Sequence, residues 1–198
     1  DRGIGKGDRF AIAMRNLPEW PVALFAIASL GAIAVPLNAW WTGEELQYGL
    51  ADSGTKLLIC DPERLAAIGP HLAELPALTT IFVSRQPGES PFGAERLESI
   101  IATSDVWHAL PEQDLPAVEI APDDPVTILY TSGTTGKPKG ALGSHRNLTT
   151  NILSSAYASA RAVLRRGEAM PAPQRRTMLT VIPLFHATAC SATLMGSV

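Results

Sequence analysis

The chain has 198 residues, of which 46% are hydrophobic, and its 16 lysines and arginines stand against 19 aspartates and glutamates, giving a net charge of −3. This length and composition suffice for the core of one ordinary domain and exclude a disordered or fibrous chain. The small net charge argues against a nucleic-acid partner, because a phosphate backbone needs a dense basic surface.

The two cysteines, Cys60 and Cys190, stand far apart and form no CxxC pair, so neither a disulfide scaffold nor a thiolate zinc site is encoded. This thiol usage is typical of a reducing compartment, and we expect a cytoplasmic protein. The most apolar stretch, residues 22–35, is too short to cross a bilayer, so no transmembrane segment is expected. The chain opens on Asp1 without a visible secretion leader, and we interpret it as a piece of a longer protein.

The first eighty residues alternate short apolar runs with helical patterns. The expected elements are a strand at 9–14, a helix at 18–30, a strand at 32–37, a helix at 42–52, a strand at 56–60, a helix at 62–73 and a strand at 79–83. Thr42 and Glu45 form a capping box, while Gly31 and Gly54 stand where a helix ends. This alternation predicts an α/β layered fold with a largely parallel sheet.

The second half of the chain begins with a weaker pattern. Residues 84–125 are rich in proline, glycine and acidic side chains and predict a surface connection with one short helix at 94–101. A strand at 125–130, a polar loop, a long helix from Ser144, an exposed loop at 165–176 and an apolar strand at 178–182 are expected to follow.

The polar segment at residues 130–140, YTSGTTGKPKG, carries the strongest chemical signal. Glycines let backbone N–H groups approach an anion, hydroxyls donate to phosphate oxygens, and lysines add compensating charge, so the segment predicts a polyphosphate cradle. It is not a Walker A loop, because only two residues separate Gly133 from Gly136 and Pro138 follows Lys137. The ordinary alternative is a flexible polar loop between strand and helix.

This segment resembles the phosphate-binding signature of the adenylate-forming (AMP-binding) superfamily, which includes acyl-CoA synthetases, luciferases and peptide-synthetase adenylation domains. The similarity extends to GDRFAI at 7–12, AIAVPLN at 32–38 and DSG at 52–54. The resemblance implies an α/β fold of layered sheets with flanking helices, of which this chain is an incomplete N-terminal domain without the C-terminal domain. It implies a first α/β subregion at about 1–83, a connection at 84–125, and a phosphate-loop and acyl-pocket subregion at 126–198.

The resemblance also assigns binding of the β- and γ-phosphates of ATP to particular residues of the loop. They are Thr131, Ser132, Gly133, Thr134, Thr135, Gly136, Lys137 and Lys139. For Lys139 a role in ordering the loop or screening charge stays open, because a lysine can do either without touching phosphate.

A second segment, IPLFHATA at 182–189, resembles the acyl-pocket segment of the same family, which implies that His186 lines the acyl and α-phosphate region. Taken alone, one histidine after an apolar run is more often structural. Amino-acid-activating members usually place an aspartate here, and none occurs in 183–198, so an apolar carboxylate such as a fatty acid is expected. His186 and Cys190 are four residues apart, but no third ligand supports a metal site.

The activity implied by the resemblance is that of an ATP-dependent acyl-CoA synthetase, most like a bacterial-type fatty-acid–CoA ligase. The carboxylate and ATP give an acyl-adenylate and pyrophosphate, and CoA then accepts the acyl group. The main Mg²⁺ ligand and the catalytic residues are expected outside this chain, so residues 1–198 alone are expected to be inactive. The alternatives are a non-catalytic nucleotide-binding module, a phosphotransferase with an atypical loop, and an adenylating enzyme for another carboxylate.

Overall fold

The computed structural model describes residues 3–131, 136–169, 172 and 177–195, apart from the side chain of Ala192. The strands are β1 (Arg9–Ala13), β2 (Ile33–Pro36), β3 (Leu57–Cys60), β4 (Thr80–Val83), β5 (Glu95–Arg96), β6 (Pro125–Thr131) and β7 (Lys139–Ser144). The helices are α1 (Glu19–Ser29), α2 (Gly43–Ser53), α3 (Pro62–Ile68), α4 (Glu98–Ile101) and α5 (His145–Arg165). Shorter helical segments are the 3₁₀ turns η1 (Gly69–Glu74) and η2 (Trp107–Ala109) and the π-helix η3 (Thr188–Leu194).

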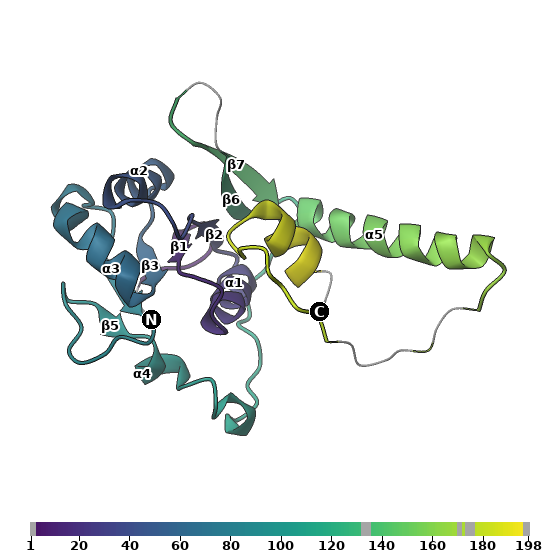
Figure 1. Cartoon of the computed structure of the whole chain (residues 1–198), viewed down its shortest axis with the longest axis horizontal. Coiled ribbons are helices and arrows are strands. Elements are labelled where there is room, and N and C mark those ends of the chain that lie inside the picture. The colour runs from purple at the N-terminus through teal and green to yellow at the C-terminus, as the bar shows by residue number, and fades with distance from the viewer. Residues whose placement is uncertain (1–2, 132–135, 170–171, 173–176, 196–198) are drawn as a thin grey trace.

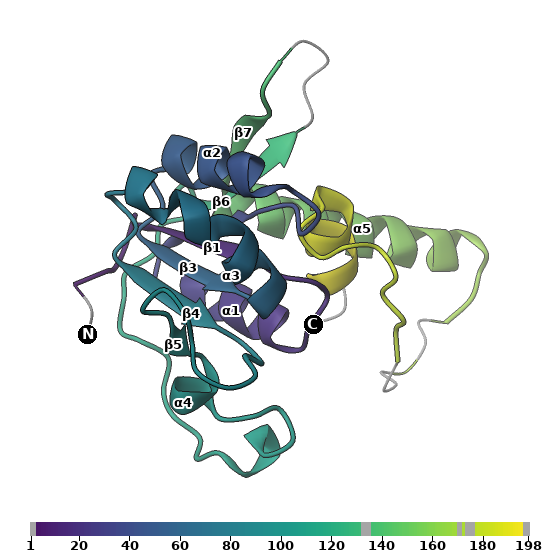
Figure 2. The same cartoon turned by 60° about the vertical axis from the view of Figure 1, so that its left-hand side comes forward.

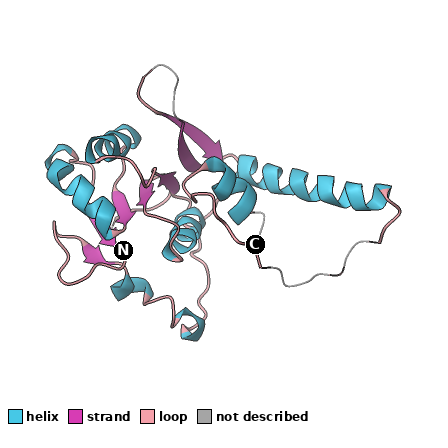
Figure 3. Cartoon of the chain, in the orientation of Figure 1, coloured by secondary structure: helices cyan, strands magenta, loops and turns pink. Residues whose placement is uncertain are grey.

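Within these residues, one seven-stranded sheet in the order β5-β4-β3-β1-β2-β6-β7 forms the centre of the molecule (Figure 1). All neighbouring strands are parallel except β7, which runs antiparallel to β6. Helices flank the strands on both sides (Figure 3). The expected α/β fold with a largely parallel sheet and flanking helices is therefore confirmed.

The two faces of the sheet bury separate apolar layers because successive side chains of a strand point to opposite faces. In β1, Phe10 and Ile12 pack with α1, whereas Ala11 and Ala13 pack with α2 and α3. Trp20 and Leu24 place the buried side of α1 on the first layer, which also takes Leu184 and Cys190 from the far end of the chain. The C-terminal segment thus shares a core with the first helix.

The helix ends follow the local sequence signals. The Thr42 N–H donates to Glu45 Oε2 at 2.8 Å, and the Glu45 N–H donates to Thr42 Oγ1 at 3.3 Å, which confirms the capping box at the start of α2. Gly31 and Gly54 follow α1 and α2 with φ of +65° and +61°, a conformation that side chains with a Cβ rarely adopt. These ends redirect the chain into β2 and β3.

Two expected elements differ from the structure. Helix α3 ends at Ile68, and the chain continues as η1 because Pro70 lacks the N–H that an α-helix needs. The expected helix at 94–101 is reduced to α4, since residues 95–96 pair with β4 as β5. The sheet therefore extends into the stretch expected to be only a connection.

Two further differences lie near the C-terminal part of the chain. The sequence does not predict β7, because Leu142 is the one large apolar residue in it and no alternating pattern results. In the structure Leu142 is exposed, and backbone pairing with β6 holds the strand. The expected strand at 178–182 is wrong. A strand needs a hydrogen-bonded neighbour, and residues 178–182 pair with none of the described strands.

The β6–β7 hairpin and α5 both project from the sheet, as the two views in Figures 1 and 2 show. The Ser144 N–H donates to Asn147 Oδ1 at 2.9 Å and so completes the capping box that begins α5. None of the described residues of α5 is buried.

Candidate functional site

The β6–β7 hairpin carries the residues expected to bind phosphate. Thr131 is the last residue of β6, and its hydroxyl donates to the carbonyl of Lys139, the first residue of β7, at 3.4 Å. Gly136 has a φ of +146°, and a Cβ there would meet nothing within 4 Å. Ser132, Gly133, Thr134 and Thr135 lie outside the described residues. The hairpin therefore brings Thr131 and Lys139 together at the end of the strand pair nearest the loop.

Helix α2 lies against the loop end of this hairpin. The Tyr48 hydroxyl donates to the carbonyl of Pro138 at 3.0 Å, and the Lys137 ammonium lies 4.8 Å from the centroid of the Tyr48 ring. A cation over an aromatic face is attracted by the negative face of the ring. Tyr48 thus places the Lys137 charge beside α2, a contact that no local sequence signal indicated.

Tyr130 connects β6 to the same helix. Its hydroxyl donates to the Asp52 carboxylate at 2.6 Å, and its ring meets Trp41 edge-on with 5.7 Å between centroids. Burial and the neighbouring Asp52 carboxylate raise the pKa of the Tyr130 phenol well above its usual range, so it stays protonated near neutral pH.

A cavity of about 330 Å³ lies between the ends of β2 and β6 and the segment that precedes η3. Its lining residues are Pro36, Asn38, Trp41, Leu129, Tyr130, Thr131, Pro138, Phe185, His186 and Ala187. The structure thus places Thr131 and His186, which are 55 positions apart in the sequence, around one cavity. Parallel strands end at the same edge of a sheet, the edge where open α/β sheets bind ligands.

The imidazole of His186 is partly oriented by its own segment. The backbone N–H of Thr188 donates to His186 Nδ1 at 3.3 Å, so a neutral imidazole carries its proton on Nε2. The side chain is exposed. His186 can therefore donate from Nε2 to an acceptor in the cavity.

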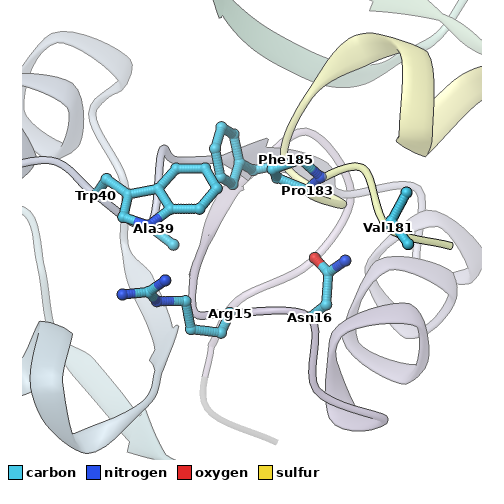
Figure 4. Close-up of a pocket in the computed structure, with 7 residues that line it drawn as sticks. All are labelled: Arg15, Asn16, Ala39, Trp40, Val181, Pro183 and Phe185. Carbon is cyan, nitrogen blue, oxygen red and sulfur yellow. The ribbon is translucent and has the colours of Figure 1, made fainter.

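A second cavity of about 290 Å³ adjoins the first and shares Phe185 with it. Figure 4 shows Arg15 and Asn16 on one side of its opening and Trp40 and Phe185 on the other. The Trp40 and Phe185 rings meet edge-on with centroids 5.3 Å apart, and the Arg15 guanidinium lies 5.2 Å from the Trp40 ring. No local sequence signal indicates the contact of Trp40 with Phe185, because the two residues lie far apart in the chain.

The described residues of the site suit the phosphates of ATP better than they suit Mg²⁺. The Thr131 hydroxyl and the Lys137 ammonium suit phosphate oxygens, which accept hydrogen bonds and carry negative charge. The residues lining the larger cavity include no carboxylate that would hold Mg²⁺. Among the described residues, no group of three or more histidines, cysteines, aspartates or glutamates could hold a metal ion.

Open α/β sheets bind ligands outside the carboxyl ends of their strands, and the β6–β7 hairpin brings glycine, hydroxyl and lysine residues to that edge. The chain belongs to the AMP-binding enzyme family, whose profile matches residues 1–198. The resemblance drawn from the loop sequence is thereby confirmed.

Curated relatives of this chain are CoA ligases by name. The Mycobacterium tuberculosis H37Rv long-chain-fatty-acid–CoA ligase FadD13 is 32% identical over 197 residues, which cover 98% of this chain and 34% of that protein. The 4-coumarate–CoA ligase 2 of Oryza sativa subsp. japonica is 29% identical over 204 residues, covering 99% of this chain and 34% of that protein. The chain therefore spans about a third of the length of these relatives.

Among solved structures, the Mycobacterium tuberculosis fatty acyl CoA synthetase superposes with a TM-score of 0.73 at 29% identity, covering 98% of this chain and 33% of that one. The fold is thus that of the corresponding part of an acyl-CoA synthetase. No described helix combines the length and apolar character needed to span a membrane.

Proposed function

We propose that residues 1–198 are part of an ATP-dependent acyl-CoA synthetase that acts on an apolar carboxylate. The observation that carries this proposal is that Thr131, at the start of the expected phosphate loop, and His186, in the expected acyl segment, line one cavity. A group that binds phosphate and a group that faces the acyl chain must meet where a carboxylate attacks ATP. ATP, Mg²⁺ and CoA are the cofactor and co-substrates that this chemistry requires.

In the first step, a carboxylate oxygen bonds to the α-phosphorus of ATP while the bond from that phosphorus to the pyrophosphate oxygen breaks. Negative charge moves to the departing pyrophosphate, and we assign its stabilisation to the loop hydroxyls and lysines. These residues are Thr131, Ser132, Thr134, Thr135, Lys137 and Lys139. Gly133 and Gly136 let backbone N–H groups come close to the phosphate oxygens. Mg²⁺, when bound, offsets further phosphate charge.

In the second step, the CoA sulfur bonds to the acyl carbon, the bond from that carbon to the AMP oxygen breaks, and the thiol proton passes to water.

We assign to His186 a role in the first step. Because it lines the cavity that Thr131 also lines, its Nε2 can donate to an oxygen of the carboxylate or of the α-phosphate. Its proposed role is thus to orient the two reacting groups.

The surroundings of His186 support an apolar acyl group. Phe185 and Ala187 line the cavity on either side of His186, and no aspartate occurs in 183–198 to pair with an amino-acid ammonium group. The names of the relatives include both fatty-acid and 4-coumarate ligases, and each of those acids is largely apolar. A fatty acid is our first choice, and an aromatic acid is the alternative.

The extent of the chain has two consequences for the proposal. Because the chain spans about a third of its curated relatives, we propose that residues 1–198 alone bind nucleotide weakly and complete no reaction. The subregions at about 1–83, 84–125 and 126–198 stay our proposed division.

Two thiols outside any disulfide favour a reducing compartment such as the cytoplasm.

The test is carboxylate-dependent exchange of labelled pyrophosphate into ATP by the full-length protein that contains this chain. The panel consists of acetate, octanoate, palmitate, benzoate, 4-coumarate and several amino acids. We expect exchange with an apolar acid and a fall of about a hundredfold or more in Ser132→Ala and Lys137→Ala, because each removes a group that stabilises departing charge.

The matched control is Lys6→Ala, since Lys6 precedes β1 at the opposite edge of the sheet and pairs with Asp124 at 2.7 Å. Its exchange rate should stay within about twofold of the unchanged protein, as expected for a surface ion pair. Silence across the whole panel with ATP still bound would contradict the proposed function and favour a non-catalytic nucleotide-binding module. Transfer of phosphate without pyrophosphate release would favour a phosphotransferase.

A further inference from the structure

The segment that delivers Phe185 and His186 to the cavity lacks the usual support of a strand. Residues 178–182 pair with no described strand, and Leu179 and Val181 are 86% and 78% exposed. Fixing a backbone in one conformation costs conformational entropy, so side-chain contacts must hold this segment in place.

The carboxamide of Asn16 makes both polar contacts that such a segment needs. Its Nδ2 donates to the carbonyl of Ile182 at 3.0 Å, and its Oδ1 accepts from the N–H of Leu184 at 2.8 Å. A carboxamide offers a donor and an acceptor side by side, as a backbone peptide group does. Asn16 therefore replaces the missing neighbouring strand at the point where the chain enters the cavity.

Asn16 is itself held by the end of β1. The N–H of the preceding residue, Arg15, donates to Asp61 Oδ2 at 3.0 Å. The buried Asp61 carboxylate also accepts from the Arg64 guanidinium at 2.8 Å and caps α3 through the Arg64 N–H at 3.0 Å. The turn that carries Asn16 is thus fixed to β3 and α3, which makes it a stable support.

The two residues that follow Leu184, Phe185 and His186, both line the cavity. Leu184 is buried in the same apolar layer as α1, Phe185 meets Trp40 edge-on, and His186 lines the cavity with Thr131. We propose that Asn16 is a positioning residue, which holds the backbone at Ile182 and Leu184 so that His186 and Phe185 face the bound carboxylate. This inference rests on the proposed function for its kinetic consequence, but not for its structural one.

Asn16 is exposed, so its replacement takes no apolar surface from the core and the variants are expected to fold. Asn16→Ala removes both contacts. Asn16→Asp keeps an oxygen acceptor for the Leu184 N–H and places a carboxylate against the Ile182 carbonyl. The matched control is Asn147→Ala, because Asn147 makes a comparable bond, to the Ser144 N–H, at the start of α5.

The first measurement is amide hydrogen exchange at Leu184 in the 198-residue chain, which requires no catalytic activity. We expect exchange to quicken about tenfold in Asn16→Ala and to stay near the unchanged value in Asn16→Asp and Asn147→Ala. Equal protection of Leu184 in the unchanged chain and in Asn16→Ala would overturn the proposal.

The second measurement is the KM and kcat of pyrophosphate exchange in the full-length protein. We expect Asn16→Ala to raise the KM for the carboxylate about five- to tenfold while the KM for ATP moves by less than about twofold, since the phosphate loop is held separately by α2. Asn147→Ala should move neither KM. An equal rise in the KM for the carboxylate and in the KM for ATP would indicate general disorder and overturn the positioning role. Absence of exchange in the unchanged protein would instead reject the proposed function, and hydrogen exchange would still decide the role of Asn16.

Discussion

The phenol of Tyr130 donates a 2.6 Å hydrogen bond to the carboxylate of Asp52, which joins the last turn of α2 to β6 one residue before Thr131. Tyr48, on the same helix, holds Pro138 on the returning side of the hairpin. Both stems of the expected phosphate loop are thus fixed to α2 by a tyrosine hydroxyl. A loop whose stems are held can present its hydroxyls and lysines with less loss of conformational entropy on binding.

Removal of the Tyr130 hydroxyl should weaken the domain. We expect Tyr130→Phe to lower the free energy of unfolding by about 1 kcal/mol, because one hydrogen bond to a charged group is lost. Urea denaturation of the 198-residue chain measures this change. Tyr157→Phe, on the exposed α5, is the control and should leave the unfolding curve in place, and an equal loss in both variants would contradict the role of the Asp52 contact.

The same bond should give a signature at high pH. Burial and the Asp52 carboxylate raise the pKa of folded Tyr130, so the folded state holds the phenol proton more tightly than the unfolded state does. The stabilisation is fully present below about pH 10, the ordinary tyrosine pKa, and is lost as pH rises toward the folded value. The stability difference between the unchanged chain and Tyr130→Phe should therefore narrow above that pH, and a constant difference would count against this linkage.

Gly54 should resist substitution more strongly than an unconstrained glycine. It ends α2 at a φ of +61°, and an added Cβ would lie 2.9 Å from Arg9 Nη2, which donates to the Gly54 carbonyl at 2.8 Å. We expect Gly54→Ala to cost about 1 kcal/mol or more in unfolding free energy. Thermal and urea unfolding should show no comparable loss for Gly5→Ala, where a Cβ meets nothing within 4 Å.

The two thiols should be unreactive while the chain is folded. Burial raises the pKa of Cys190 to about 11 and moves that of Cys60 in the same direction. Because the thiolate is the reactive form, we expect neither thiol to react with a disulfide reagent at pH 8 at the rate of a free cysteine. Full reaction on addition of concentrated urea is the control, and rapid labelling of the native chain would show that η3 or β3 opens readily.

The exposed side of α5 should make the isolated chain associate. Leu153, Tyr157 and Leu164 are each more than 60% exposed and recur at spacings that place them near one another on the helix. We expect sedimentation velocity to show association that grows with concentration, and less of it in a Leu153→Gln, Tyr157→Gln double variant. Asn151→Gln, on the same helix, is the control, and a monodisperse monomer at high concentration would refute this expectation.

Local sequence patterns determined much of this protein. The Thr42–Glu45 capping box, the positive φ of Gly31 and Gly54, and the alternation within β1 depend on residues close together in the chain, and each was predictable from spacing alone. The density of glycine, hydroxyl and lysine around Lys137 likewise indicated a phosphate loop and, through resemblance, the family. Such signals act over a few residues, so no tertiary structure was needed to find them.

Only the tertiary structure decided how distant segments meet. Strand β7 forms by pairing with β6, whereas residues 178–182 pair with no described strand and stay outside the sheet. The bonds from Asn16 to Ile182 and Leu184 and the contact of Trp40 with Phe185 join residues more than 140 positions apart. Which of many possible partners such a side chain meets depends on the packing of the whole sheet, and no local pattern contains that information.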